Sequence, residues 1–356
     1  MNYWWDLITT HYVQGSFWTP WGFMKLPSLL DGIMQVISQL GEEAVWILVV
    51  SLLFWVGYKR ESLYLGSLIF VNAVINLWLK YTIYRMRPTW YEAFIFHDSS
   101  GPSMPSGHAQ LTAAASFYTA RTVSRKLKAM NKAAEKGTIM TKNGVILYFL
   151  ALILTILVSL SRVYLGVHWP TDVIAGSIMG FTVFAFYSAL AERVWRAVKP
   201  RLPTSMLSKC VAVVLLGVAI GVLTPPSWEV GWRAGGFLAG LFVGAALEAE
   251  TVKLSEPKTL RYACVRVIVG LLALSLLAFV ADEIYSGITA PIDLTELLLG
   301  FFIIPSQLPP WTSLIAIVLL EPFMHPFFGA VQFPLYALIG LWISLAAPYV
   351  FKVLRL

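Results

Sequence analysis

Charged side chains are scarce in this chain, which has 356 residues and only 13% Asp, Glu, Lys and Arg. Soluble domains carry about 25% charged residues. The 58% share of hydrophobic residues therefore leaves too little polar surface for a water-soluble globule. Cysteine is rare as well: Cys210 and Cys264 fall in or beside apolar segments and support neither a disulfide framework nor a metal site. This composition favours a protein whose solvent is largely lipid.

Apolar runs long enough to cross a bilayer recur along the chain, since a spanning helix needs about 20 mostly apolar residues. We therefore predict an all-α fold, a polytopic transmembrane helical bundle of about nine spans. The spans are expected near residues 43–58, 62–84, 106–124, 144–163, 170–191, 208–223, 232–249, 264–281 and 330–351. Residues 29–40 have apolar positions at helical spacing and predict an interfacial helix. Two shorter pieces, 294–304 and 311–321, are interpreted as re-entrant or interfacial.

The basic residues are distributed unevenly over the predicted loops. If the N-terminus is outside, 20 of the 26 Lys and Arg residues lie on the inner side, which is the pattern of cytoplasmic loops. The net charge of +7 is explained in this way, and no nucleic-acid partner is expected. The other six are Lys25, Lys80, Arg85, Arg87, Arg162 and Arg233. Because a cation near a membrane is costly unless it faces water or a partner, we interpret Lys80, Arg87 and Arg162 as candidates for holding a phosphate.

A further anion-binding feature stands where the third span begins, in the sequence Pro105-Ser106-Gly107-His108. Pro suits a helix start, Ser can cap it, and Gly lets a ligand approach the backbone. Free amides at a helix N-terminus attract anions. His108 would then point into that site, although the tetrad alone is equally consistent with a simple capping turn.

His168 and Asp172 are four residues apart at the start of the fifth span. This spacing can bring the carboxylate to one imidazole nitrogen and leave the other nitrogen as a nucleophile. Taken alone, the pair is better explained as a capping Asp beside an interfacial His. However, the cations Lys80, Arg87 and Arg162, the tetrad 105–108 and this pair all fall on the same predicted membrane face, at the ends of spans two to five. Together they supply what phosphoryl transfer requires, because its catalysis is mostly positioning and charge stabilisation.

These residues resemble the three-part signature of the type 2 phosphatidic acid phosphatase superfamily. That signature reads Lys-x6-Arg-Pro, Pro-Ser-Gly-His and Ser-Arg-x5-His-x3-Asp, and every fixed position is filled in order between Lys80 and Asp172. The resemblance covers roughly residues 43–191 and implies a six-helix phosphatase-type core with extra C-terminal spans. The expected domains are an N-terminal interfacial segment, the phosphatase core and a C-terminal transmembrane extension, at residues 1–42, 43–223 and 224–356.

The resemblance also implies a role for each matched residue. His168 is similar to the nucleophile that becomes phosphohistidine, Asp172 to its orienting partner, and His108 to the general acid that protonates the leaving oxygen. The residues expected to bind the phosphate are Lys80, Arg87, Ser106, Gly107 and Arg162. No metal and no cofactor are expected.

Three interpretations of the function remain open. The first is a phosphatase of lipid phosphates or polyprenyl diphosphates, the second a sugar phosphatase of glucose-6-phosphatase type, and the third an anion or lipid transporter or binder without catalysis. The expected partners are the phosphorylated substrate and membrane lipids. A homodimer through the stripe Gly236, Gly240 and Gly244 is the alternative to packing of that stripe within the chain. The active site is expected at the extracytoplasmic or lumenal face of a plasma membrane or endoplasmic reticulum, with the C-terminus in the cytoplasm.

Overall fold

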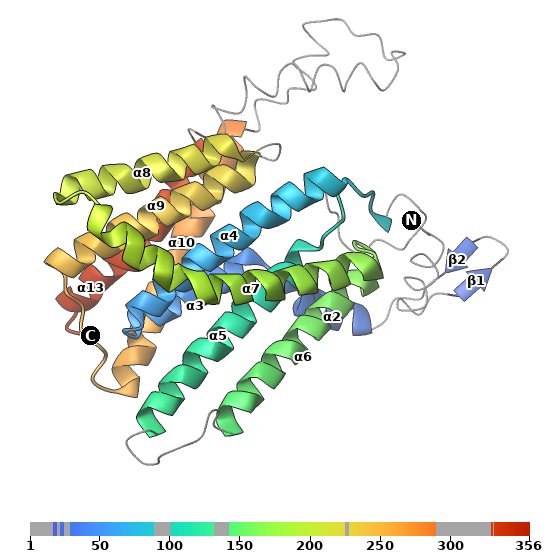
Figure 1. Ribbon diagram of the computed structural model, residues 1–356, viewed down its shortest axis with the longest axis horizontal. Coiled ribbons are helices and arrows are strands. Elements are labelled where there is room, and N and C mark those ends of the chain that lie inside the picture. Colours follow the sequence, from blue (N-terminus) through green and yellow to red (C-terminus); the bar gives the residue numbers. More distant parts are fainter. Residues whose placement is uncertain are drawn as a thin grey trace, which may run out of the picture. The chain divides into compact units, whose positions relative to one another are not determined.

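The computed structural model describes residues 17–19, 22–24, 29–88, 101–131, 142–224, 228–289, 329 and 331–356. Helices dominate the described part of the chain (Figure 1). Its β structure is one antiparallel hairpin, formed by β1 (Phe17–Thr19) and β2 (Gly22–Met24). The predicted all-α class is confirmed apart from this hairpin. The pieces 294–304 and 311–321 lie outside the described residues.

Each of the nine predicted spans falls on a helix. The predicted interfacial helix is α2 (Leu29–Gln39). The first eight spans are α3 (Glu43–Trp55), α4 (Lys59–Ile83), α5 (Gly107–Asn131), α6 (Lys142–Tyr164), α7 (Pro170–Val198), α8 (Met206–Leu223), α9 (Trp228–Thr251) and α10 (Leu260–Thr289). A short 3-10 turn, η2 (Lys199–Arg201), follows α7. The last span, Val331–Val353, includes the π-helical stretch η3 (Trp342–Ala346) and α13 (Ala347–Val353).

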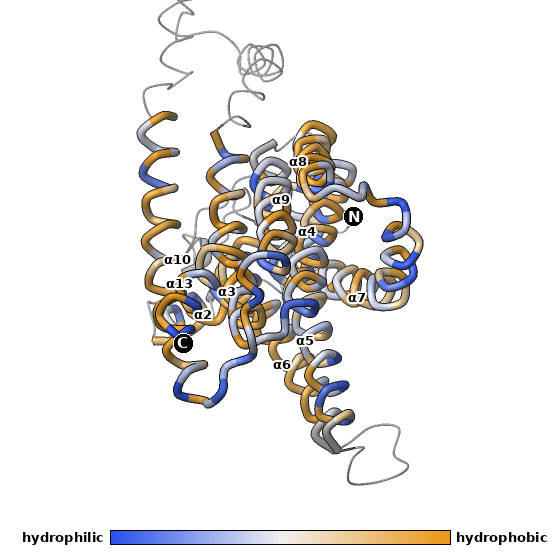
Figure 2. The backbone as a smooth tube through the Cα atoms, turned by 90° about the vertical axis from the view of Figure 1, so that its left-hand side faces the viewer, coloured by the Kyte–Doolittle hydropathy of each residue, from blue (hydrophilic) through white to orange (hydrophobic). Residues whose placement is uncertain are grey.

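Seven of the described helices are long and apolar enough to cross a membrane, and α2 with α3, bent by 50° at their junction, would make an eighth. Long apolar stretches along the helices are visible in Figure 2. The third predicted span, α5, does not reach the same hydropathy because Ser, Thr and basic residues interrupt its alanines. It packs against both α6 and α7, and its small side chains such as Ala109, Ala113 and Ala114 are buried there. Neighbouring helices therefore cover α5, which needs fewer large apolar side chains.

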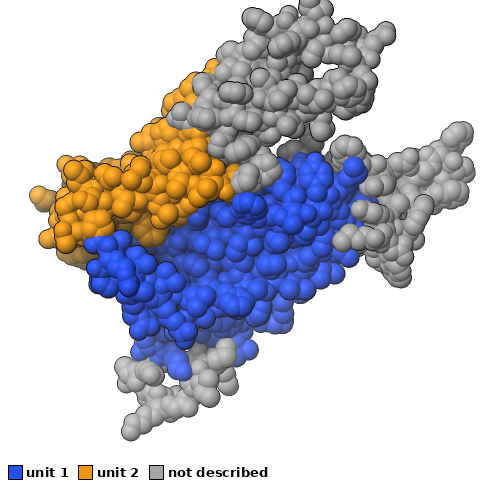
Figure 3. Space-filling model, turned by 45° about the horizontal axis from the view of Figure 1, so that its top comes forward, with its two compact units in different colours: residues 1–50, 60–202 blue, residues 51–59, 203–356 orange. Residues whose placement is uncertain are grey.

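Packing divides the chain into two compact units (Figure 3). Unit 1 comprises residues 1–50 and 60–202, and unit 2 comprises residues 51–59 and 203–356. In unit 1, α5 lies between α6 and α7, and α2 packs against α6. All residues predicted to form the site belong to unit 1. The predicted functional division at residues 42 and 223 stays a prediction.

In unit 2, glycines let the helices approach closely. A Cβ on Gly217 or Gly235 would clash with the carbonyl oxygen of the other, which fixes the contact of α8 with α9. A Cβ on Gly236 or Gly240 of α9 would clash with a carbonyl oxygen of the last span, and a Cβ on Gly244 would clash there with the hydroxyl of Ser344. This glycine stripe is therefore used for packing within the chain.

Candidate active site

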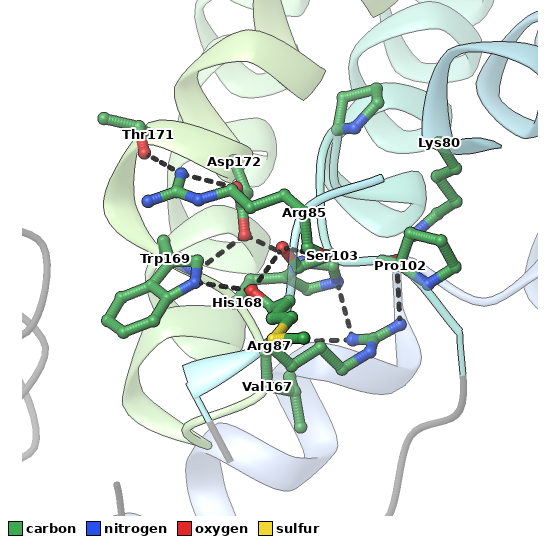
Figure 4. Close-up of polar contacts among 12 residues, drawn as sticks. Lys80, Arg85, Arg87, Pro102, Ser103, Val167, His168, Trp169, Thr171 and Asp172 are labelled. Carbon is green, nitrogen blue, oxygen red and sulfur yellow. Dashed lines mark hydrogen bonds and ion pairs between the residues drawn. The ribbon is translucent and has the colours of Figure 1, made fainter. Parts of the chain in front are cut away.

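Two of the predicted phosphate ligands converge on the short segment that precedes α5. Nζ of Lys80, in the last turn of α4, donates to the carbonyl oxygen of Pro102 at 2.6 Å. Nε of Arg87 donates to the carbonyl oxygen of Gly101 at 2.9 Å, and its Nη2 lies 3.5 Å from that of Pro102. Figure 4 shows both cations reaching Pro102 from different segments. Two positive charges that are seven residues apart in sequence are thereby held together.

The turn between α6 and α7 explains the spacing of Arg162 and His168. Gly166 adopts a φ of +74°, a conformation that is open to glycine at no steric cost. Its N–H donates to the carbonyl of Val163 at 3.0 Å, and the N–H of Val167 donates to that of Arg162 at 3.3 Å. This is the Schellman hydrogen-bond pattern, which ends a helix and reverses the chain. The five residues between Arg162 and His168 are thus the length of one capping turn.

His168 is buried, with 2% of its surface exposed. Its Nδ1 lies 3.5 Å from Oδ2 of Asp172, close enough for an ion pair but without the geometry of a hydrogen bond. Its Nε2 faces Nη1 of Arg87 at 3.5 Å, and that same Nη1 donates to the carbonyl of Val167 at 2.9 Å. The two ring nitrogens thus face groups of different sign: Nδ1 faces the negative carboxylate of Asp172, and Nε2 faces the positive guanidinium of Arg87.

The surroundings of His168 disfavour its protonated form. Burial lowers the pKa of His168 well below its ordinary 6.5, and the positive charges of Arg87, Lys80 and Arg162 lower it further. All three predicted phosphate-binding cations therefore act on this imidazole, although they come from the end of α4, the segment after α4 and the end of α6. The imidazole is held neutral in a strongly positive environment.

Asp172 has two strong partners besides His168. Its Oδ2 accepts from the backbone N–H of Trp169 at 2.9 Å, which caps α7, and its Oδ1 accepts from Nη1 of Arg85 at 2.9 Å. The hydrogen bond to Trp169 shows that Asp172 caps α7, whereas its role in orienting His168 stays a prediction. Arg85, with 4% of its surface exposed, also donates to Oγ1 of Thr171, and its guanidinium lies 5.3 Å from the Trp169 ring. Figure 4 shows Arg85 on the side of Asp172 away from Arg87.

The turn at Ser106 and Gly107 is held between α4 and α7. The N–H of Ser106 donates to the carbonyl of Asp172 at 3.0 Å. A Cβ on Gly107 would lie 3.2 Å from Oδ1 of Asn76, whose Nδ2 lies 3.3 Å from the carbonyl of Pro105. The Ser106 hydroxyl is buried and makes no hydrogen bond to any described residue. It is therefore an available donor beside the first turn of α5.

His108 contacts a residue that the sequence analysis did not single out. Its Nε2 lies 2.8 Å from Oε1 of Glu42, at the junction of α2 and α3. The preceding Gly41 packs so closely that an added Cβ would lie 2.9 Å from Cβ of His108 and 2.8 Å from Cγ1 of Val158. The junction therefore sits directly on the histidine.

Helix α2 also contacts the last predicted cation. Nη1 of the buried Arg162 donates to Oγ of Ser38 at 2.6 Å. Two residues further along α6, the hydroxyl of Tyr164 donates to Oδ1 of Asp31 at 2.6 Å. A segment that was predicted only as an interfacial helix is thus built into the surroundings of the site.

The structure brings all eight predicted site residues into one region of unit 1. Sequence reasoning missed Arg85, Ser38 and Glu42. For Arg85 a signal existed, because it is one of the six basic residues on the predicted outer side and stands two positions from Arg87. Nothing in the local pattern marked Ser38 or Glu42, since their partners lie far along the chain.

Comparison with known proteins identifies the family. Residues 61–196 match the model of the PAP2 superfamily. A curated relative, an undecaprenyl-diphosphatase of Sulfolobus acidocaldarius, is 31% identical over 158 residues, which are 42% of this chain and 66% of the relative. Phosphatidylglycerophosphatase B of Bacillus subtilis is 28% identical over 47% of this chain and 78% of its own. A glucose-6-phosphatase catalytic subunit 1 of Haplochromis nubilus is 25% identical over 50% and 53%.

The chain therefore belongs to the PAP2 superfamily, through the segment that carries the signature. With its apolar helices it is an integral membrane protein. The first 60 residues, which include Ser38 and Glu42, lie outside the matched segment, as do all residues after 196.

Proposed function

We propose that this protein is a membrane phosphatase that hydrolyses a lipid phosphate or polyprenyl diphosphate through a phosphohistidine at His168. The observation that carries the proposal is the placement of His168 between Asp172 and Arg87, with Lys80 and Arg162 acting on the same ring. A neutral imidazole with one nitrogen toward a carboxylate and the other toward cations is suited to attack a phosphoryl group.

In the first chemical step, Nε2 of His168 attacks the phosphorus. A proton on Nδ1 is stabilised by Asp172 at 3.5 Å, so the lone pair remains on Nε2. The Nε2–P bond forms as the bond from phosphorus to the leaving oxygen breaks. His108 donates its proton to that oxygen. In the second step water attacks the phosphorus, His108 takes up a proton from the water, and the Nε2–P bond breaks to release phosphate.

Positive charge around the phosphoryl oxygens is the main source of stabilisation in this proposal. Lys80, Arg87 and Arg162 provide that charge, and the buried Ser106 hydroxyl and the amides at the start of α5 add hydrogen bonds. Arg85, which is not one of these three cations, pairs with Asp172 and balances its negative charge. The charges of Lys80, Arg87 and Arg162 are then left for the phosphoryl group. The cations supply the charge neutralisation that a metal ion provides elsewhere, and we propose a metal-independent reaction.

The active site is proposed to face the extracytoplasmic or lumenal side. Its residues come from the ends of α4 and α6 and from the starts of α5 and α7, which lie at one end of unit 1. Support comes from the charge distribution, since 20 of the 26 basic residues fall on the opposite side of the predicted bundle. The C-terminus is then cytoplasmic.

The choice of a lipid substrate rests on the relatives. Those with the higher identity are named for undecaprenyl diphosphate and phosphatidylglycerophosphate, whereas the glucose-6-phosphatase relative is 25% identical. A sugar phosphatase therefore remains the second candidate. The two candidate functions share the proposed chemistry at His168 and differ in the group that the substrate carries on its phosphate.

Phosphate release by the purified full-length protein in detergent tests the proposal. Undecaprenyl diphosphate, phosphatidylglycerophosphate and glucose 6-phosphate should be compared at equal concentration, with His168→Ala as the inactive control. We expect turnover of at least one lipid, a preference for it over the sugar phosphate, and an acid-labile, base-stable phosphoenzyme that is absent from His168→Ala. Preference for glucose 6-phosphate would favour the sugar phosphatase. Binding of all three without turnover would make the protein a binder or transporter.

A further inference from the structure

A polar pocket lies in unit 1, far from the residues of the proposed phosphatase site. It has a volume of about 190 Å³, several times the roughly 30 Å³ that one water molecule occupies in the liquid. Its walls come from the first turns of α4, the second half of α5 and the last turns of α7. Arg60 in its wall and Lys80 of the phosphatase site are twenty residues apart on α4, or about 30 Å. This separation equals the thickness of the hydrocarbon core of a bilayer, so the two sites open at opposite membrane faces.

The pocket carries an excess of positive charge. Its walls contain four cations and two carboxylates: Arg60, Arg121, Arg125, Lys126, Glu61 and Glu192. Arg60 pairs with Glu192, and Lys126 pairs with Glu61 at 3.6 Å. These pairs balance two of the four cations. The pocket therefore keeps a net charge of about two positive units, contributed by Arg121 and Arg125.

Arg121 and Arg125 are one helical turn apart on α5, so their guanidinium groups lie over the same stretch of the pocket wall. Arg121 donates through Nη1 to the carbonyl of Ser188 at 3.1 Å, which anchors it to α7 without neutralising it. Two like charges at this spacing repel each other and destabilise an isolated helix. An anion between them would remove that cost.

Three tyrosines, Tyr64, Tyr118 and Tyr187, complete the pocket wall and indicate its depth in the membrane. Tyr187 donates its hydroxyl proton to the carbonyl of Tyr64 at 2.9 Å, and the rings of Tyr118 and Tyr187 meet edge to face. The guanidinium of Arg60 lies 5.5 Å from the centre of the Tyr64 ring. Tyrosines mixed with Arg and Lys are characteristic of the level of the lipid head groups.

A charged surface that serves only membrane orientation needs no shared pocket for its cations. Here the cations and aromatic rings of three helices line one shared pocket that is open to water, and exposed ion pairs such as that of Arg60 contribute little to stability. We propose that this pocket binds the phosphate of an anionic phospholipid head group in the leaflet opposite the phosphatase site. Basic pockets between transmembrane helices are suited to such head groups. A free phosphate ion shares this chemistry, so the test separates the two sources.

Lipid binding to the full-length protein in neutral detergent provides the test, by native mass spectrometry and by the thermal unfolding midpoint. The probes are phosphatidylglycerol, phosphatidylcholine and inorganic phosphate. The test variant is Arg121→Gln/Arg125→Gln. The matched control is Arg193→Gln, which removes a charge from an exposed position on α7 outside the pocket wall.

We expect phosphatidylglycerol to bind the wild-type protein and Arg193→Gln equally and to raise their unfolding midpoints, whereas phosphatidylcholine does neither. In the double variant, binding of phosphatidylglycerol should weaken about thirtyfold, from two lost cations. If the double variant does not fold, Arg125→Gln alone, at an exposed position, should weaken binding about fivefold. Any lipid bound at the phosphatase site contributes equally to the control and the test variant.

Three outcomes would overturn the proposal: no binding of phosphatidylglycerol above that of phosphatidylcholine, equal binding by the double variant and Arg193→Gln, or full occupancy of the pocket by inorganic phosphate alone. Each is independent of the proposed phosphatase activity, which is measured on the same samples by phosphate release.

Discussion

Oε1 of Glu42 lies 2.8 Å from Nε2 of His108, although the two residues are 66 positions apart in the chain. A carboxylate at this distance favours the charged form of an imidazole and opposes the burial that disfavours it. His108 must carry a proton in order to donate it to the leaving oxygen. The contact therefore makes Glu42 a positioning residue for the proposed general acid.

Replacing Glu42 by Gln should lower kcat about tenfold, less than the 10²- to 10⁴-fold contribution typical of a complete general acid. The alkaline limb of the pH–rate profile should move to lower pH, because the imidazolium loses its stabilising charge. An activated aryl phosphate, whose leaving group needs little protonation, should show a smaller defect than a lipid substrate. Glu43→Gln, the same change at the next residue, is the matched control. An equal loss on both substrates would mean that Glu42 acts only on structure.

The pair of Arg85 and Asp172 should control stability as well as activity. Both side chains are almost fully buried, with exposed fractions of 3% and 0%. Breaking such a pair from one side costs about 3–5 kcal/mol, because a buried charge is left alone. Arg85→Ala should therefore lower the thermal unfolding midpoint in detergent sharply and reduce kcat more than it changes KM. Arg60→Ala, which breaks the exposed pair with Glu192, should cost less than about 1 kcal/mol. Equal midpoints for the two variants would contradict this account.

The acid limb of kcat/KM should lie well below pH 6.5. Burial and the charges of Arg87, Lys80 and Arg162 lower the pKa of His168, and its neutral form is the nucleophile. Activity should thus persist at pH values where an ordinary histidine is already protonated. Removing one of these charges, as in Arg87→Gln, should move the acid limb of the residual activity upward toward 6.5. A limb that stays in place would show that another group controls it.

The lowered pKa of His168 has a matching effect on stability. Between pH 6.5 and its own lower value, the unfolded state binds a proton at His168 that the folded state does not. Stability should therefore fall as the pH decreases through this window, by up to about 1.4 kcal/mol per pH unit. His168→Ala removes this contribution, so its unfolding midpoint should depend less on pH there.

Chelators should leave the phosphatase activity unchanged, since Lys80, Arg87 and Arg162 are proposed to neutralise the phosphoryl charge. Vanadate, which can mimic the five-coordinate phosphorus, should inhibit competitively with substrate. Loss of activity in a chelator, restored by a divalent cation, would contradict the metal-independent reaction. The same assay on Arg162→Ala should show weaker inhibition by vanadate.

Local sequence spacing predicted much of this site because the geometry behind it is local. Arg162 and His168 are joined by one capping turn, and Asp172 reaches Trp169 and His168 within the first turn of α7. Hydropathy located the helices for the same reason, since each span must be apolar along its own length. Its weakest case was α5, where other helices rather than lipid cover the surface.

Contacts between distant segments were not predictable in this way. Ser38 reaches Arg162, and Glu42 reaches His108, across separations of 124 and 66 residues. No short pattern encodes the packing of α2 on α6, so these residues looked like parts of the N-terminal interfacial segment. Arg85 was predictable in part: the sequence showed a basic residue on the expected membrane side, but it did not show the pairing with Asp172.

The close approach of Gly41 to His108 and Val158 limits how this protein can be recombined with its relatives. The junction of α2 and α3 packs against α5 and α6 with no room for even one methyl group. A chimera that exchanges only the segment matched by the family, 61–196, would pack the helices of a relative against an α2–α3 junction that fits the helices of this protein. Exchange from residue 29 onward would move α2 and its junction together with α5 and α6, and would keep the contact of Glu42 with His108.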